Sequence, residues 1–189
     1  MEAEDRRTRQ ELYDAGALGG HYVPRLEELH AKNALRLREI LSTHGWPHQD
    51  LVGTDGADAA WLIVQHAIGE PDLQRQALLL LQEHAAQERI PAWHCAYLED
   101  RIAMYEDRPQ RYGTQWLDDP IDGRIRPWSL AEPDRVNELR ASVGLDSMRP
   151  VPERGPELPE EEQQTIRENH RWWQQWLASR GCPSTGLPE

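Results

Sequence analysis

Apolar residues recur along most of the chain at spacings of three and four residues, the pattern of amphipathic helices. The pattern is weak in the first, charged segment and strong in the later ones. Proline opens several segments and glycine follows several ends, as is common in helices. The predicted helices cover about residues 2–14, 24–44, 56–68, 71–87, 91–106, 132–143 and 159–180. We therefore expect a mainly α fold, an irregular bundle of five to six helices with a further C-terminal helix.

The helical pattern is interrupted between residues 107 and 130. Two short segments, 111–117 and 124–130, flank the turn-forming string Asp118-Asp-Pro-Ile-Asp-Gly123, so they predict a small β-hairpin. Prolines are frequent after residue 148 and indicate a linker. The expected parts are a helical domain with the hairpin, a Pro-rich linker, and a Trp-rich amphipathic C-terminal helix with its tail. Their expected bounds are 1–148, with the hairpin near 111–130, then 149–158 and 159–189.

The predicted helix over residues 56–68 is small or apolar on nearly every side, which indicates a central position. It nevertheless carries two adjacent polar residues, Gln65 and His66. His30 and Asn33 lie in the same way on the apolar stripe of the preceding long helix. Buried polar groups need hydrogen-bond partners. These side chains therefore either brace neighbouring helices or belong to a functional site.

The net charge of −12 argues against a nucleic-acid partner, because phosphates need a positive surface. It also argues against an anionic membrane surface, and no apolar run approaches the ~20 residues of a membrane span. The N-terminal string Met-Glu-Ala-Glu-Asp is unlike a signal peptide. Cys95 and Cys182 lie far apart, which disfavours a disulfide framework or a cysteine zinc site. We expect a cytoplasmic protein with no nucleic-acid and no membrane partner.

Several short motifs follow one another in a specific order and spacing: Gly45-Trp-Pro47, Trp61-Leu-Ile-Val-Gln65-His66, Ala96-Tyr97-Leu-Glu-Asp100-Arg101 and Tyr112-Gly-Thr-Gln115. Together they resemble the uncharacterised bacterial domain-of-unknown-function family 6624 over roughly residues 25–148. The resemblance implies no settled activity, and the Trp-rich C-terminal segment lies outside it. It implies which positions matter. These are Gln65, His66, Gln74, Asp100, Arg101, Tyr112 and Gln115.

His66 is the leading candidate for chemistry, because a neutral imidazole in a half-buried site can exchange a proton near neutral pH. Asp100 would orient it or stabilise its cation, and Tyr112 would donate a hydrogen bond. Amide side chains suit an amide, carboxylate or sugar-like ligand, and arginine suits an acidic group. The predicted substrate-binding residues are Gln65, Gln74, Arg101, Gln115 and Asn33. The alternative is a structural polar network, in which Gln115 would fix the hairpin to the bundle.

No metal and no other cofactor is expected. The alternative is one divalent metal that involves His66, with His84, His94 and Asp100 as further ligands from successive helices. None of these residues shows the His-x-x-x-His or Glu-x-x-His spacing that places two ligands on one helix turn. Cys95 does not form a nucleophile pair with His94, because adjacent residues on a helix point in different directions.

The sequence therefore predicts a small-molecule-acting enzyme, in the setting of specialised metabolite biosynthesis, with His66 as general acid/base. Glutamines together with tryptophan and tyrosine would line its pocket. The alternative is an acidic interaction protein of the inhibitor or immunity type, whose polar cluster is structural. Its contact surface would be the Trp-rich C-terminal helix, which would also support a homodimer.

Overall fold

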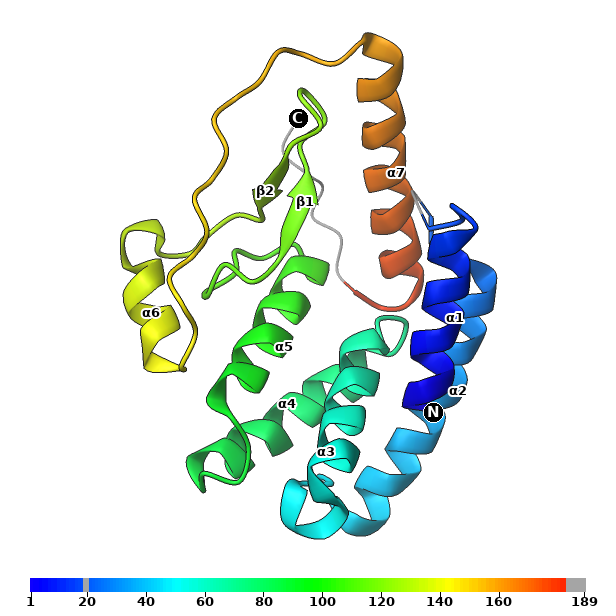
Figure 1. The fold of residues 1–189 in the computed structure, drawn as a ribbon, viewed down its shortest axis with the longest axis vertical. Helices are drawn as coiled ribbons and strands as arrows, with labels where there is room; N and C mark the ends of the chain where they lie inside the picture. Colours follow the sequence, from blue (N-terminus) through cyan, green and yellow to red (C-terminus); the bar gives the residue numbers. More distant parts are fainter. Residues whose placement is uncertain (19–20, 183–189) are drawn as a thin grey trace. The chain divides into compact units, whose positions relative to one another are not determined.

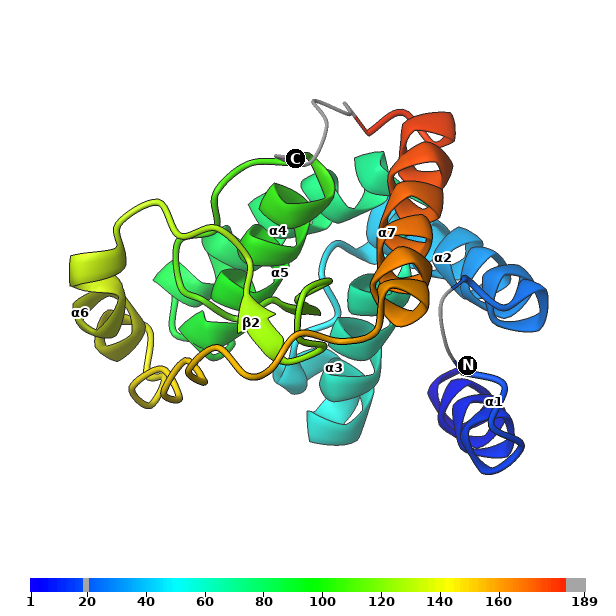
Figure 2. The same cartoon turned by 90° about the horizontal axis from the view of Figure 1, so that it is seen from above.

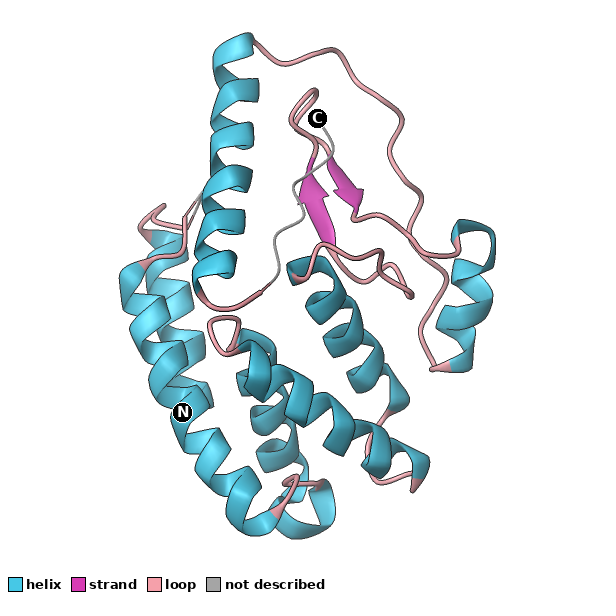
Figure 3. Cartoon of the chain, turned by 180° about the vertical axis from the view of Figure 1, so that it is seen from behind, coloured by secondary structure: helices cyan, strands magenta, loops and turns pink. Residues whose placement is uncertain are grey.

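The structure is a computed structural model that describes residues 1–18 and 21–182 (Figure 1). The chain divides into two compact units, Met1–Leu98 and Glu99–Glu189. The described part of the N-terminal unit is built from helices, and the C-terminal unit combines helices with a small hairpin (Figure 3). The prediction of a mainly α fold with a hairpin and a C-terminal helix is confirmed.

The N-terminal unit contains four complete helices and the start of a fifth. They are α1 (Glu2–Asp14), α2 (Pro24–His44), α3 (Gln49–His66), α4 (Pro71–Ala86) and α5 (Ala92–Tyr105), which continues into the C-terminal unit. α1 contacts α2 and α3, and α3 also contacts α2 and α4. The dark-blue α1 and the lighter-blue α2 can be followed in Figure 1. Except at α3, these bounds lie within a few residues of the predicted ones.

Backbone chemistry sets the ends of these helices. Pro24 occupies the first turn of α2, where its missing N–H costs no hydrogen bond. Gly45 ends the same helix with a φ of 70°, which favours glycine. The sequence predicted that α3 starts near residue 56, but the helix begins at Gln49. Gly53, with a φ of 73°, interrupts it, so the predicted helix corresponds to the part after this kink.

The core of the N-terminal unit consists of apolar side chains from α2, α3 and α4. Leu37, Val64, Leu73 and Leu81 are at most 1% exposed. Trp46, directly after α2, is also 1% exposed and belongs to this core. Each such side chain contributes about 1.5–3 kcal/mol relative to an exposed position. This packing fixes the relative positions of α2, α3 and α4, and with them any polar group that the helices bury.

The C-terminal unit contains a two-stranded antiparallel hairpin, as the turn-forming string predicted. β1 (Trp116–Asp118) pairs with β2 (Ile125–Pro127), so that Trp116 faces Pro127 across the ladder. The strands have three residues each. They are therefore shorter than the two segments that the sequence indicated. Beside them, the Trp128 N–H still donates to the Gln115 carbonyl at 3.0 Å, and side chains hold the preceding turn.

The turn over residues 110–115 is held by two buried polar side chains. Asp100, which is 0% exposed, accepts hydrogen bonds from the backbone N–H groups of Arg111 at 2.8 Å and of Thr114 at 2.9 Å. Its carboxylate also accepts from the Tyr112 N–H and the Thr114 hydroxyl. The Gln110 side chain donates to the Gln115 carbonyl and accepts from its N–H. Asp100 and Gln110 thus replace the strand pairing that this turn lacks.

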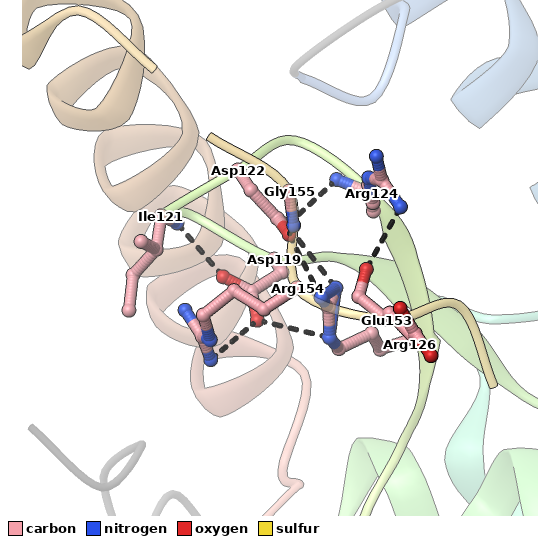
Figure 4. Close-up of polar contacts among 8 residues, drawn as sticks. All are labelled: Asp119, Ile121, Asp122, Arg124, Arg126, Glu153, Arg154 and Gly155. Carbon is pink, nitrogen blue, oxygen red and sulfur yellow. Dashed lines mark hydrogen bonds and ion pairs between the residues drawn. The ribbon is translucent and has the colours of Figure 1, made fainter. Parts of the chain in front are cut away.

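The Pro-rich segment over residues 149–158, here called the strap, has no helix or strand, as predicted. It is bound to the hairpin loop (Figure 4). Asp122 accepts a hydrogen bond from the Gly155 N–H at 2.8 Å, and Arg124 donates to the Glu153 carbonyl at 2.8 Å. Seen from above, the strap passes the hairpin on its way to the last helix (Figure 2). The linker is therefore a fixed part of this unit.

Two further helices complete the described part of the C-terminal unit. The predicted helix over 132–143 begins as a 3-10 turn, η1 (Pro133–Arg135), and continues as α6 (Val136–Ser142). α7 (Glu160–Ser179) matches the predicted C-terminal helix, and its first turn carries three glutamates that favour a helix N-terminus. In the described part of the chain, no helix is both long and apolar enough to cross a membrane.

We predict that Asp100→Asn destabilises the protein by roughly 2–4 kcal/mol, because an amide N–H₂ would replace an acceptor that faces several N–H donors. Urea unfolding measures this free energy. The matched control is Glu138→Gln on the surface of α6, where Glu138 is 68% exposed and pairs with Arg135. We expect a much smaller loss there, because solvent screens an exposed ion pair. Equal stability of the two variants would show that Asp100 does not hold the turn.

Candidate functional site

Three titratable side chains from three helices meet inside the N-terminal unit. Asp5 comes from the first turn of α1, His30 from the buried stripe of α2, and His66 from the last turn of α3. One ligand atom of each lies within 4.8 Å of the other two. We call these three residues the aspartate–histidine cluster. It is the functional site that the structure offers most clearly.

The distances within the cluster centre on one carboxylate oxygen. Asp5 Oδ2 lies 2.7 Å from His66 Nδ1, which is a hydrogen bond. The same oxygen lies 3.4 Å from His30 Nε2, without a hydrogen bond. The two imidazole rings are 5.0 Å apart between centroids and tilted by 30°. Asp5 therefore bonds directly to one imidazole and faces the second.

The cluster is deeply buried. The side chains of Asp5, His30 and His66 are 0%, 5% and 17% exposed. Burial of a carboxylate is costly unless it is paired. Asp5 Oδ1 and His30 Nε2 are nevertheless buried without a hydrogen-bond partner among the described residues. His66 is the most exposed member of the cluster.

The electrostatics of the cluster favour a neutral imidazole beside an ionised carboxylate. Burial alone would raise the pKa of Asp5, but the neighbouring His30 and His66 outweigh it and hold that pKa well below its usual range. Burial lowers the pKa of His66, against the opposing pull of Asp5. At neutral pH the Nδ1–H of a neutral His66 then donates to the Asp5 carboxylate. The lone pair of Nε2 is left to accept a proton.

Two more polar side chains belong to the surroundings of the cluster on α2. Tyr22, just before this helix, hydrogen-bonds through its hydroxyl to His30 Nδ1. Asn33 lies one turn beyond His30, is 2% exposed, and has no hydrogen-bond partner for its amide oxygen or nitrogen among the described residues. A polar group left in this way costs about 1–3 kcal/mol. More buried polar atoms around His30 therefore lack hydrogen-bond partners than is usual in a core that serves only stability.

The residues predicted from the sequence fall into both units. The N-terminal unit holds His66, Gln65, Gln74 and Asn33, and the C-terminal unit holds Asp100, Arg101, Tyr112 and Gln115. Their joint action in one site stays a prediction.

The predicted residues of the C-terminal unit take part in its turn. Asp100 binds the backbone of residues 111–114, and the Tyr112 N–H is one of its donors. Gln115 donates through Nε2 to the Thr114 hydroxyl at 2.9 Å, so it works within the turn itself. In the N-terminal unit, Gln74 donates to the Val64 carbonyl at 3.0 Å and ties α4 to α3. These contacts give several of the predicted residues a structural function.

Asp5 was not among the residues predicted from the sequence. Its helix has a weak apolar pattern, and only Asp5 and Thr8 are buried on it. Their three-residue spacing is a faint signal of a polar face turned inward. His30 was recognised as a buried polar residue, but its pairing with His66 depends on how α2 and α3 pack. Tertiary contacts, and not local spacing, assemble the cluster.

The histidines suggested as metal partners of His66 have other neighbours. His84 lies against His48, with 4.9 Å between ring centroids. His94 stacks on Trp61 at 4.6 Å and meets the edge of Trp93 at 4.1 Å. Neither belongs to a group of potential metal ligands among the described residues. Burial in this aromatic setting lowers the pKa of His94 from 6.5 to about 4.

Comparison with known proteins identifies the family. The model of a family of unknown function, DUF6624, matches residues 1–153, and the chain belongs to this family. The match reaches the N-terminus, so α1 and Asp5 lie within the family domain, while α7 lies beyond it. No curated protein and no solved structure matches the chain.

We predict that His94 makes stability depend on pH between about 6.5 and 4. Above this window both the folded and the unfolded chain carry a neutral His94. Within it only the unfolded chain takes up the proton, so folding loses stability as the pH falls, by up to about 3 kcal/mol. Denaturant unfolding from pH 7 to pH 4 measures this loss.

His94→Gln removes this titration and serves as the comparison. The stability of the variant should therefore fall less steeply over the same pH window than that of the wild-type chain. Parallel pH profiles for the two proteins would contradict the buried, neutral state of His94.

Proposed function

We propose that this member of DUF6624 is an enzyme that acts on a small molecule, with His66 as its general acid/base. Asp5 takes the orienting role that the sequence analysis gave to Asp100. The observation that carries the proposal is the 2.7 Å hydrogen bond between His66 Nδ1 and the fully buried Asp5 carboxylate.

The hydrogen bond fixes which nitrogen of His66 can react. Because Nδ1–H is held by Asp5, Nε2 is the basic nitrogen of the neutral ring. The ring is 17% exposed and Asp5 is 0% exposed, so a ligand reaches the imidazole before it reaches the carboxylate. An orienting carboxylate that selects one tautomer is a general device of acid/base catalysis.

The charges of the pair suit proton transfer at neutral pH. The lowered pKa of His66 leaves its ring unprotonated and ready to accept a proton. Asp5, whose pKa is held below its usual range, then stabilises the imidazolium that forms. The same group can return the proton to a leaving group. Acid/base assistance of this kind contributes about 10²–10⁴-fold in rate.

Buried polar atoms without hydrogen-bond partners indicate that the cluster has a function other than stabilising the fold. A network kept for stability would satisfy its buried atoms, whereas Asp5 Oδ1, His30 Nε2 and the Asn33 amide are buried without partners among the described residues. Apolar side chains would fill this space at lower cost. Polar groups that cost stability are typical of sites that bind or react.

The proposal includes three further predictions made from the sequence. They are a cytoplasmic location, a place in specialised metabolite biosynthesis, and substrate binding by Gln65, Gln74, Arg101, Gln115 and Asn33. The expected ligand is a small molecule and not a nucleic acid or a membrane.

The alternative proposal is an acidic interaction protein that uses α7. Trp172, Trp173 and Trp176 form an edge-to-face and stacked cluster on this helix, which lies outside the family match. The rings are only partly buried. A partner protein or a second copy of the chain would cover them, in which case loss of the tryptophans would abolish association and leave the aspartate–histidine cluster unaffected.

We predict that His66→Gln lowers turnover by about 10²–10⁴-fold. The assay is a panel of chromogenic esters, amides, glycosides, phosphate esters and enolisable ketones, screened first on the wild-type chain. Asp5→Asn should lower turnover at least about tenfold, because it removes the orienting charge. The matched control is His44→Gln on the exposed end of α2, which should keep full activity.

A second measurement does not depend on whether the variants fold. In the wild-type chain, kcat/KM should rise with pH and level off below the ordinary histidine pKa of 6.5, because burial lowers the pKa of His66. Full turnover in a folded His66→Gln variant would overturn the proposal, as would a panel without any turnover by the wild-type chain.

A further inference from the structure

We infer that Asp5, His30 and His66 bind one divalent transition-metal ion through two imidazole nitrogens and one carboxylate. The inference rests on the proposed function in one respect, because it takes the same cluster as the reaction centre. It goes beyond that function by changing the role of His66 from general base to metal ligand. It adds the chemical class of a cofactor, which is a first-row divalent ion such as Zn²⁺, Fe²⁺ or Co²⁺.

The distances among the donor atoms fit such an ion. Asp5 Oδ2 lies 2.7 Å from His66 Nδ1 and 3.4 Å from His30 Nε2. Ions of this class bind imidazole nitrogen and carboxylate oxygen at about 2.0–2.2 Å. Two donors on one ion then lie about 3 Å apart. The three donors, all within 4.8 Å of one another, need only small shifts to enclose an ion.

Two atoms of the cluster are left without a hydrogen-bond partner in the described part of the chain. His30 Nε2 and Asp5 Oδ1 are buried without a hydrogen-bond partner, and their side chains are 5% and 0% exposed. A buried carboxylate oxygen is unfavourable unless a positive charge or a hydrogen-bond donor lies beside it. A metal ion supplies that charge.

Tyr22 prepares His30 for this role. The Tyr22 hydroxyl hydrogen-bonds to His30 Nδ1, so the second ring nitrogen, Nε2, is the one that faces Asp5. Metal-bound histidines commonly bond through their other nitrogen to a group that fixes the tautomer and the ring orientation. Tyr22 therefore serves as a positioning residue for the metal ligand.

A metal ion and a proton compete for His66 Nδ1 and Asp5 Oδ2. In the metal-free chain a proton lies between His66 Nδ1 and Asp5 Oδ2. Binding of an ion to Nδ1 would move that proton to Nε2 of the same neutral ring. At lower pH the imidazoles must first lose a proton to bind the ion, so affinity falls as the pH falls. With the ion bound, His66 is a ligand and no longer the base. Three protein ligands leave a coordination position for water, whose pKa the ion lowers so that it takes over proton transfer.

The ion would also connect three helices. Asp5 is on α1, His30 on α2 and His66 on α3. Bonds from one ion to all three side chains tie the short, charged α1 to the core of its unit. Metal binding should therefore stabilise the folded chain and slow amide hydrogen exchange in α1, which is a readout independent of activity.

The test uses the full-length chain, treated with a chelator and then titrated with Zn²⁺ by calorimetry at pH 7.5. We expect one ion per chain and a rise in melting temperature. Co²⁺ should give the visible absorption of a nitrogen- and oxygen-bound site. His30→Gln and His66→Gln should each lose at least about tenfold in affinity. His84→Gln, from the separate His48–His84 pair, is the matched control and should bind as the wild type does.

Tyr22→Phe keeps all three ligands and tests the site if the ligand variants fail to fold. Its affinity should fall about tenfold or more, because His30 loses the hydrogen bond that orients it. Absence of stoichiometric Zn²⁺ binding by the wild-type chain would overturn the inference. Binding that is unchanged in folded His30→Gln and His66→Gln variants would overturn it as well.

The inference and the proposed function fail in different ways. Stoichiometric Zn²⁺ binding without turnover of any substrate class would keep the metal site and overturn the enzyme. Turnover by the metal-free chain that depends on His66, together with no Zn²⁺ binding, would keep the acid/base enzyme and overturn the metal site.

Discussion

A single buried carboxylate constrains the N-terminal unit. Asp5 is 0% exposed, and its Oδ2 atom meets one imidazole from α2 and one from α3. An ionised carboxylate in such a place needs positive or donor groups around it, since its desolvation costs several kcal/mol. The packing of α1 against α2 and α3 provides those groups. Structure and chemistry therefore depend on the same contact: the residue that brings three helices together also sets the tautomer and the charge of His66.

The two units use a buried aspartate in different ways. Asp100 is surrounded by backbone N–H groups and a hydroxyl, which satisfy both of its oxygens and fix the turn over residues 110–115. Asp5 has one hydrogen bond and an oxygen without a partner among the described residues. A fully satisfied carboxylate stabilises the fold, whereas one with spare coordination can take a proton or an ion. This difference is why Asp5, and not Asp100, stands at the centre of our account.

The sequence predicted the fold well, whereas its choice of site residues stays a prediction. Helix ends follow from local chemistry, such as Pro24 at the start of α2 and Gly45 at its end, so they were readable in the sequence. The kink at Gly53 hid the true start of α3. His66 stood out because a polar residue on an apolar helix needs a partner. Asp5 did not stand out, because its helix is charged along its whole length. Nothing in the local spacing predicts that one of these acidic side chains is buried. Long-range packing alone supplies that information.

The most direct test of this account is the protonation state of His66 in the metal-free chain, read from long-range ¹H–¹⁵N correlation spectra at pH 7. We expect a neutral ring with its proton on Nδ1, held by Asp5, and a basic Nε2. The Asp5→Asn variant should lose this preference for one tautomer. A His66 ring with its proton on Nε2, or a doubly protonated ring at pH 7, would contradict the central role given to the contact between Asp5 and His66.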